Sequence, residues 1–366
     1  MTDAAPAGRG LTEPDPLDDD ARRAELDPGD MARAIATLGD QLRAAAERLP
    51  TIVVPPGPEP WQGVAVLGMG GSAMGADLIR AVFADRARLP IVVSREPDLP
   101  AWVGPSTLVV ASSHSGGTAE TLAATRAAIE RGAAIVAVTS GGDMAALGDA
   151  HGTRVAIAPG GQPRAALGSS AGLVLGVLAA AGVIDRDVAR AELLAAAAAC
   201  DQGTARLGPA VDTAGNPAKQ VARSLESRIA VVVGGGHLAP VARRWKTQLN
   251  ENAKTWAAWD ELPELAHNTL VGLDAAPVLR RAVQVIVLHG SDAPDATARR
   301  RAVEDELEAS GTAHTTLSVE PGTRLAEAFA GIVLGDWVSF HLAMLRGVNP
   351  SLIEPIVRYK ARLAAG

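Results

Sequence analysis

Short apolar runs alternate with helical patterns along the first half of the chain. Apolar runs rich in Val, Ile and Ala occur at 64–67, 91–94, 107–112, 134–139 and, more briefly, 155–157. Runs of this kind, bounded by glycine or polar residues, are typical of buried parallel strands. The spacing of apolar residues indicates one helix at about 30–48, before the first run. It indicates a second helix that follows the first run and extends to about residue 84, and a third at about 119–131. Strands that alternate with such helices predict βαβ units and a parallel sheet.

The second half of the chain repeats this plan. An alanine-rich helical stretch at about 187–205 is followed by apolar runs at 229–233, 283–288 and 315–319, with helices near 239–260 and 293–309. We therefore predict an α/β fold of two doubly wound domains, each a parallel sheet flanked by helices. The expected division is a flexible acidic leader at 1–30, a first domain at 31–205 and a second domain at 206–366.

Composition narrows the class of protein. The chain has 366 residues, of which 48% are apolar and 20% charged, and this excludes a disordered or collagen-like chain. The single cysteine, Cys200, cannot form an internal disulfide, and the acidic N-terminus lacks the apolar core of a signal peptide, so we expect a cytoplasmic protein. A net charge of −7 argues against a nucleic-acid partner. The uncharged segment 165–184 is long enough to span a membrane, but its four glycines and two serines favour a buried core helix, so no membrane partner is expected.

Two glycine loops follow predicted strands. Residues 68–73 read GMGGSA and open a helix, and residues 234–239 read GGGHLA at the same place in the second half. Glycines there let a ligand approach backbone N–H groups at a helix N-terminus, which favours phosphate. Both loops also fit a dinucleotide fingerprint, with Glu96 as a candidate ribose ligand, so a nicotinamide dehydrogenase is one alternative. A tight turn without a ligand is the other alternative, and it is favoured for the second loop.

A more specific motif follows the third predicted strand, where residues 113–121 read SHSGGTAET. Three hydroxyl groups surround two glycines at a helix N-terminus, and together with backbone N–H groups they can bind the oxygens of a phosphomonoester. An ordinary capping box is the alternative interpretation, but it needs only one hydroxyl. No Walker lysine follows either loop, and no His, Cys or Asp cluster has the spacing of metal ligands, so we expect no metal and no redox cofactor.

The helix predicted near 239–260 carries an apolar stripe typical of a core, formed by Val241, Trp245, Leu249 and Trp256. Glu251 lies away from this stripe, which indicates a solvated or interface carboxylate. His267 follows in a loop and, by pattern alone, is a surface histidine.

Together these motifs resemble the bifunctional phosphoglucose/phosphomannose isomerases of the sugar isomerase (SIS) superfamily. The resemblance extends from about residue 60 to the end and rests on GMGGSAMGADL, S-x-S-G-x-T-x-E-T, QPRAALG, and RWKxQLNENAK followed by PExxHN. The last pair, in which His267 follows Glu251 by sixteen positions, is the most specific.

The resemblance implies two SIS domains in a homodimer that interconverts glucose 6-phosphate or mannose 6-phosphate with fructose 6-phosphate. It implies that the substrate phosphate is bound by Gly71, Ser72, Ser113, Ser115 and Thr118. Arg164 would stabilise developing negative charge, and Glu251 would move the proton between C1 and C2. His267 of the partner subunit and Lys360 would help to open the sugar ring. A carboxylate, a histidine, an arginine and a phosphate anchor are the groups that this chemistry needs.

The chain differs from the usual family pattern at a few positions: His114 and Gly117 in the hydroxyl loop, Ala266 and Thr269 around the histidine, and Leu352 and Ile353 before the C-terminal motif. None of them replaces a named catalytic group. A SIS-type regulator that binds a sugar phosphate without turnover is a second class of function. Glu251 and His267 argue against it, because a sensor needs no base.

Overall fold

The computed structural model describes residues 15–57, 61–158 and 160–365 of the chain. The first sheet has five parallel strands in the order β2-β1-β3-β4-β5. Their bounds are β1 Gly63–Leu67, β2 Ile91–Ser94, β3 Thr107–Ser113, β4 Ala134–Thr139 and β5 Gly152–Ala156. The order in which strands are added reverses between β1 and β3: β2 lies on one side of β1, and β3, β4 and β5 lie on the other. In open α/β sheets, ligands bind at the carboxyl ends of the strands at such a topological switch point.

The second sheet repeats this topology with four parallel strands in the order β7-β6-β8-β9. Their bounds are β6 Ile229–Gly235, β7 Ala257–Leu262, β8 Val283–His289 and β9 His314–Ser318. β6 and β8 of the second sheet therefore correspond to β1 and β3 of the first. The predicted α/β fold class, with two parallel sheets flanked by helices, is confirmed.

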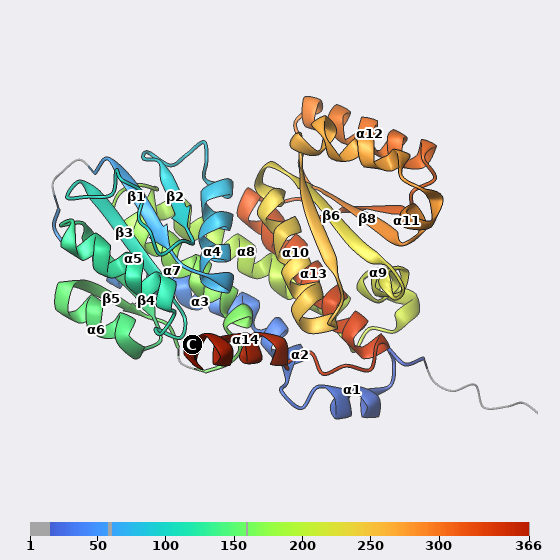
Figure 1. The fold of residues 1–366 in the computed structure, drawn as a ribbon, viewed down its shortest axis with the longest axis horizontal. Helices are drawn as coiled ribbons and strands as arrows, with labels where there is room; N and C mark the ends of the chain where they lie inside the picture. Colours follow the sequence, from blue (N-terminus) through green and yellow to red (C-terminus); the bar gives the residue numbers. More distant parts are fainter. Residues whose placement is uncertain (1–14, 58–60, 159, 366) are drawn as a thin grey trace, which may run out of the picture.

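Helices connect the strands and cover the sheets. In the first half they are α1 Asp20–Leu26, α2 Met31–Ala36, α3 Leu38–Arg48, α4 Gly70–Val82, α5 Ala119–Glu130, α6 Gly142–His151 and α7 Leu167–Ala180. After them come α8 Arg186–Leu207, α9 Pro217–Leu225, α10 Ala239–Ala253, α11 Pro277–Arg281, α12 Pro294–Ala309, α13 Arg324–Leu345 and α14 Glu354–Ala365. Figure 1 shows the first sheet on the left and the second on the right, with α4, α10 and α13 between them.

The core lies between the sheets and these central helices. The uncharged segment predicted as a core helix forms α7, and most of this helix is buried. Among the described residues, two helical segments could cross a membrane by length and composition alone, Pro163–Ala180 and α13, but 78% and 89% of their most apolar 18-residue windows are buried inside the protein. α13 packs on α8 and α10, so a single buried helix joins both halves of the chain.

The structure corrects two predicted helices. The helix expected at 30–48 is interrupted at Thr37 and forms α2 and α3. The helix expected near 239–260 ends at Ala253, because Lys254 adopts a left-handed conformation with φ 53°. Trp256 is therefore outside the helix and 81% exposed, so its assignment to the apolar core stripe is wrong. The residues that follow form β7, an edge strand that the sequence analysis missed.

The segment expected to be a flexible leader lies partly outside the described residues, which begin at residue 15. The described part forms α1 and contacts the second half of the chain. The Asp18 carboxylate accepts a hydrogen bond of 2.7 Å from the buried Lys219 Nζ, and Arg22 Nη2 donates to the Met344 carbonyl oxygen at 3.1 Å. These contacts attach the N-terminal helix to α9 and α13.

Candidate active site

Two loops meet at the carboxyl ends of β1 and β3, at the switch point of the first sheet. The first follows β1 and turns into α4 through Gly70, whose φ of 51° favours glycine. The second follows β3 and turns at Gly116, with φ 70°. A Cβ atom on Gly116 would lie 1.7 Å from the Gly141 carbonyl oxygen, so no other residue fits there. Both glycine positions therefore shape backbone that borders the same point of the sheet.

Hydroxyl groups converge at this point. Ser113 is buried at the end of β3, and its Oγ donates to Thr118 Oγ1 at 3.3 Å. The Ser72 Oγ accepts a hydrogen bond from the His114 N–H at 3.3 Å, which joins the two loops. Ser115 is exposed, and its Oγ accepts a hydrogen bond from the Gly117 N–H at 3.4 Å. Hydroxyl and N–H donors at the N-terminus of α5 are a suitable environment for a phosphate group.

The segment around Arg164 lies against both loops. The His114 Nε2 atom is 3.2 Å from the Gly160 carbonyl oxygen. A Cβ atom on Gly71 would lie 3.0 Å from the Pro163 carbonyl oxygen, so a side chain here would push the neighbouring backbone away by a few tenths of an ångström. Gly71 thus brings the predicted phosphate loop next to the short helix η2 (Pro163–Ala166), on which Arg164 lies.

The Arg164 guanidinium is 5% exposed, and Nη1 lies 3.5 Å from Glu251 Oε2 at the end of α10. Its Nε donates to Asn252 Oδ1 at 3.0 Å and its Nη2 donates to the Pro350 carbonyl oxygen at 2.7 Å. Burial lowers the pKa of Arg164, and the nearby Glu251 carboxylate opposes this shift. The structure therefore brings together a fixed cation and a partly exposed carboxylate from distant parts of the chain.

Lys254 is a further group at this site that the sequence analysis missed. Its Nζ donates to the Glu251 carbonyl oxygen at 2.6 Å and approaches the Pro350 carbonyl oxygen at 3.4 Å. Burial lowers the pKa of Lys254 to about 8, and the neighbouring Arg164 adds to the effect. The lysine caps the last turn of α10 and thereby holds the backbone that carries Glu251.

A stripe of buried polar residues on α10 contacts Arg164 and the backbone that carries it. Arg244, Gln248 and Asn252 recur at helical spacing and are all buried. Arg244 forms an ion pair of 2.7 Å with Asp336 of α13, in which both side chains are 2% exposed. Arg244 Nη2 also donates to the Arg164 carbonyl oxygen at 3.0 Å. These polar residues recur at i, i+4 and i+8 and therefore lie on one face of the helix, next to its apolar stripe. This spacing is a signal from which the polar stripe could have been predicted.

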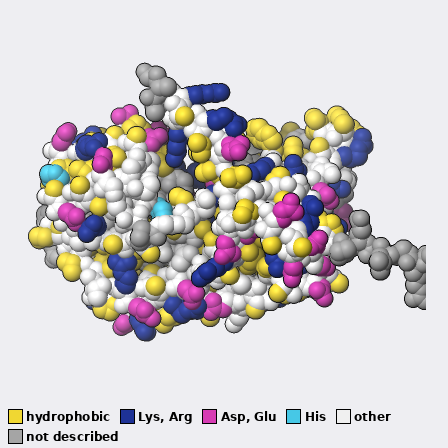
Figure 2. Space-filling model, turned by 90° about the horizontal axis from the view of Figure 1, so that it is seen from below, with side chains coloured by type: hydrophobic (Ala, Val, Ile, Leu, Met, Phe, Trp, Pro, Cys, Tyr) yellow, Lys and Arg dark blue, Asp and Glu magenta, His cyan; other side chains and the backbone are white. Residues whose placement is uncertain are grey.

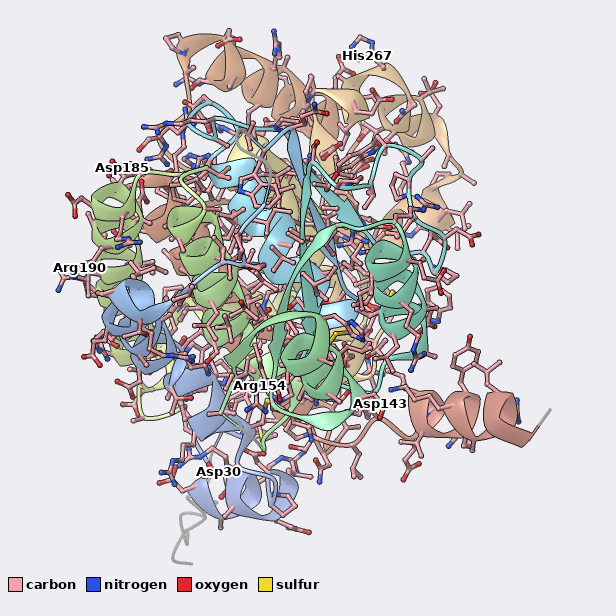
Figure 3. All side chains as sticks on the ribbon, turned by 90° about the vertical axis from the view of Figure 1, so that its left-hand side faces the viewer. Asp30, Asp143, Arg154, Asp185, Arg190 and His267 are labelled. Atoms are coloured by element: carbon pink, nitrogen blue, oxygen red, sulfur yellow. The ribbon has the colours of Figure 1, made fainter. Side chains whose placement is uncertain are left out.

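A cavity of about 790 Å³ opens beside Glu251 and Lys254. Its other wall is the C-terminal segment from Leu352 to Arg358, together with the exposed Trp256. Helix α14 stands out from the body of the molecule in Figure 3, and Figure 2 shows the same face from below. The helix carries exposed hydrophobic side chains. The proton-transfer candidate therefore faces a cavity that is large enough for a small ligand.

Two predicted site residues lie apart from this group. His267 is exposed at the end of the short helix η5 (Glu264–His267), at the upper outer edge of the molecule in Figure 3 and far from α14. Lys360 is exposed on α14. Within the described part of the chain, neither side chain forms a hydrogen bond or an ion pair with Arg164 or Glu251.

The same described residues contain no group of three His, Cys, Asp or Glu side chains arranged to hold a metal ion. Glu96, the candidate ribose ligand of the dehydrogenase alternative, is exposed shortly after β2.

Fold and site together define the class of protein. Two doubly wound parallel sheets, with a hydroxyl-rich loop at the switch point of the first, are the arrangement of the SIS domains. A family model described as the bacterial phospho-glucose isomerase C-terminal SIS domain matches residues 214–363. A glucose-6-phosphate isomerase like protein from Thermus thermophilus has a similar structure, with a TM-score of 0.57, 22% identity, and coverage of 91% of this chain and 94% of that one.

Relatives with higher sequence identity show the family to which the chain belongs. A bifunctional phosphoglucose/phosphomannose isomerase from Caldicellulosiruptor bescii is 33% identical over 91% of this chain and 99% of its own length. One from Aquifex aeolicus is 30% identical over 83% of this chain and 91% of its own length. The chain belongs to the family of bifunctional phosphoglucose/phosphomannose isomerases and is an isomerase. This finding favours the predicted isomerase over both the dehydrogenase and the sensor.

Proposed function

We propose that this protein interconverts glucose 6-phosphate, mannose 6-phosphate or both with fructose 6-phosphate, through an enediolate and without a metal ion. The observation that carries the proposal is the placement of Arg164, 3.5 Å from Glu251, beside the hydroxyl loops at the switch point of the first sheet. We propose further that the enzyme is a cytoplasmic homodimer of two-domain chains, with the domains meeting near residue 205.

The phosphate anchor is the cluster of hydroxyl and N–H groups at residues 72 and 113–118. Ser72, Ser113, Ser115 and Thr118 belong to this cluster, and Gly71 permits its approach to η2. The N-terminus of α5 favours a dianion through its dipole. When the phosphate is bound by this cluster, the carbon chain of the sugar extends toward Arg164.

Glu251 is the proton carrier. Its carboxylate takes the proton from C2 of the open-chain aldose, and the electron pair of the C–H bond forms the C1–C2 double bond of the enediolate. Return of that proton to C1, with transfer of the O2 proton to O1, gives the ketose. One base serves both carbons, because the two positions are adjacent. The side chain is 29% exposed, so substrate can reach it.

Arg164 stabilises the negative charge that develops on O1 and O2. Its guanidinium is held by Asn252 and by the Pro350 carbonyl oxygen, so the charge is in place before the reaction begins. A preorganised donor in a site with little water stabilises a transition state more than a mobile one does.

His267 completes the site from a second copy of the chain, and Lys360 assists the opening of the sugar ring. His267 is exposed and apart from Glu251 within one chain, which suits a role across a subunit interface. The interface surface includes exposed Trp256 and the apolar residues of the C-terminal segment, namely Leu352, Val357, Tyr359 and Leu363. Large apolar side chains gathered on one projecting element are typical of a surface that another protein covers.

A coupled assay of the purified protein with each hexose 6-phosphate, in the presence of EDTA, tests this function. We expect turnover of fructose 6-phosphate in at least one direction and no loss of rate on chelation. Loss of activity in EDTA that zinc restores would overturn the metal-free mechanism. Binding of every hexose 6-phosphate without turnover would contradict the proposed reaction.

A further inference from the structure

The second sheet has its own switch point, where the loops after β6 and β8 meet. The loop after β6 contains the second glycine motif and turns at Gly236, whose φ of 53° matches the 51° of Gly70 in the first sheet. The loop after β8 contains Gly290 and Ser291, at the place that the hydroxyl loop occupies after β3. The two halves of the chain therefore present corresponding loops at corresponding points of their sheets.

A carboxylate of the chain itself occupies the second of these points. Glu327, in the first turn of α13, is 1% exposed. Its two oxygens accept hydrogen bonds from the Ser291 N–H at 3.3 Å and from the Ser291 hydroxyl. His237 Nε2 lies 2.8 Å from Oε2, and the Gly322 N–H donates to Oε1 at 3.4 Å. Backbone N–H, hydroxyl and imidazole groups thus surround the carboxylate as they would surround a bound anion.

The backbone is shaped around this carboxylate. A Cβ atom on Gly290 would lie 2.5 Å from Glu327 Oε2 and 3.1 Å from Cδ. Glycine at this position therefore lets the backbone approach the negative charge directly, which is one of the uses of glycine at anion sites. The contact of Gly290 with Glu327 is independent of the hydrogen bonds and leads to the same site.

We propose that the second switch point is an anion-binding site whose ligand is the chain's own Glu327, so that each chain binds phosphate only at the first switch point. Beside it lies a cavity of about 400 Å³ that Arg299, Arg300 and Arg324 line. These arginines contact Asp295 at 3.5 Å, Glu304 at 2.7 Å and Asp85 at 2.8 Å, respectively. Removal of the Glu327 carboxylate leaves its donors without an acceptor and opens the site to an external anion of the phosphate class.

The main test measures how inorganic phosphate changes the melting temperature at constant ionic strength. The starting variant is Ser115→Ala/Thr118→Ala, which removes two donors of the first site and should weaken the response of the melting temperature to phosphate. Adding Glu327→Ala to it should lower the melting temperature and restore a phosphate-dependent rise of several degrees, because a ligand that binds only the folded state stabilises it. A folded triple variant without this rise would overturn the proposal.

A starting variant that still responds to phosphate as the wild type does would instead contradict the proposed phosphate loop, so failure of the two proposals can be distinguished. Glu327→Gln covers the case in which the alanine variant does not fold. It keeps the shape but places a neutral amide among the donors, so it should melt lower than the control Glu306→Gln, whose residue is exposed on α12. Equal melting temperatures of these two variants would show that the site does not require an anion and would overturn the proposal.

Discussion

The Arg164 guanidinium lies 3.5 Å from the Glu251 carboxylate, and the next residue, Asn252, accepts a hydrogen bond from the same guanidinium at 3.0 Å. Two consecutive residues of α10 thus have different tasks. Asn252 is fully buried and fixes the arginine, whereas Glu251 remains partly exposed beside the cavity. The arginine is held by a neutral group, so its charge remains available to the carboxylate and to a substrate.

The first prediction concerns Glu251. Glu251→Gln keeps the shape of the side chain but cannot accept a proton, so kcat should fall by about 10²–10⁴-fold. Binding of 6-phosphogluconate should persist, because the phosphate loop is unchanged. Steady-state kinetics and calorimetry measure the two effects, with Glu306→Gln on the exposed face of α12 as the control. A variant with wild-type kcat would mean that another group carries the proton.

The second prediction concerns the geometry of Arg164. Arg164→Lys keeps a positive charge but loses the planar donor set that contacts Asn252 and Pro350. By analogy with the loss of an oxyanion donor, kcat should fall by about 10²–10³-fold. Lys246→Arg on α10 is the reciprocal control. If the lysine variant turns over at the wild-type rate, charge alone is sufficient and the fixed geometry is unimportant.

The third prediction concerns the hydroxyl loop. Ser115→Ala/Thr118→Ala should mainly raise KM, because each lost hydrogen bond to a charged phosphate costs about 1.5–3 kcal/mol. Rates measured over a wide range of substrate concentration separate KM from kcat. A wild-type KM combined with a lower kcat would assign this loop to the chemical step instead.

The fourth prediction concerns the shared site. In a mixed dimer of Glu251→Gln and His267→Ala chains, one site receives both defects and the other receives neither. Two nearly inactive preparations, unfolded and refolded together, should therefore recover up to about a quarter of the wild-type activity, since half of the dimers are mixed. If mixed dimers form but stay inactive, His267 does not act across the interface.

The fifth prediction concerns acid stability. His341 lies on α13, is 1% exposed, and its Nε2 is 2.8 Å from the Leu207 carbonyl oxygen. Burial lowers the pKa of His341 from 6.5 to about 4. The unfolded chain therefore binds more protons between these values, and the free energy of unfolding falls as the pH decreases from about 6.5 to about 4.

Replacing this histidine by glutamine removes the titrating group. The free energy of unfolding of His341→Gln should therefore fall less steeply than that of the wild type over this pH range. Denaturant unfolding at a series of pH values measures the difference, and His151→Gln, at an exposed position, should keep the wild-type slope. Parallel curves for wild type and His341→Gln would contradict a buried neutral histidine.

The strands and the loops after them could be predicted because their signals are local. In an apolar run such as 134–139, the side chains themselves indicate a strand that is buried inside a sheet, and the structure confirms this run as β4. The glycines at 70 and 116 likewise mark turns whose backbone conformation excludes most other residues. The edge strand β7 was missed because half-exposed residues such as Trp259 and Asp260 lack such a run.

The grouping of the site could be predicted only in part. The sequence by itself determined which side chains are present and that two phosphate-type loops follow corresponding strands. Only the tertiary structure decided that Arg164 lies against Glu251, that Lys254 ends the helix there, and that Glu327 fills the second loop site. The physical reason is that these pairs are joined by packing of α10 and α13 between the two sheets, and the side chains of one segment carry no local signal of the partner that packing provides.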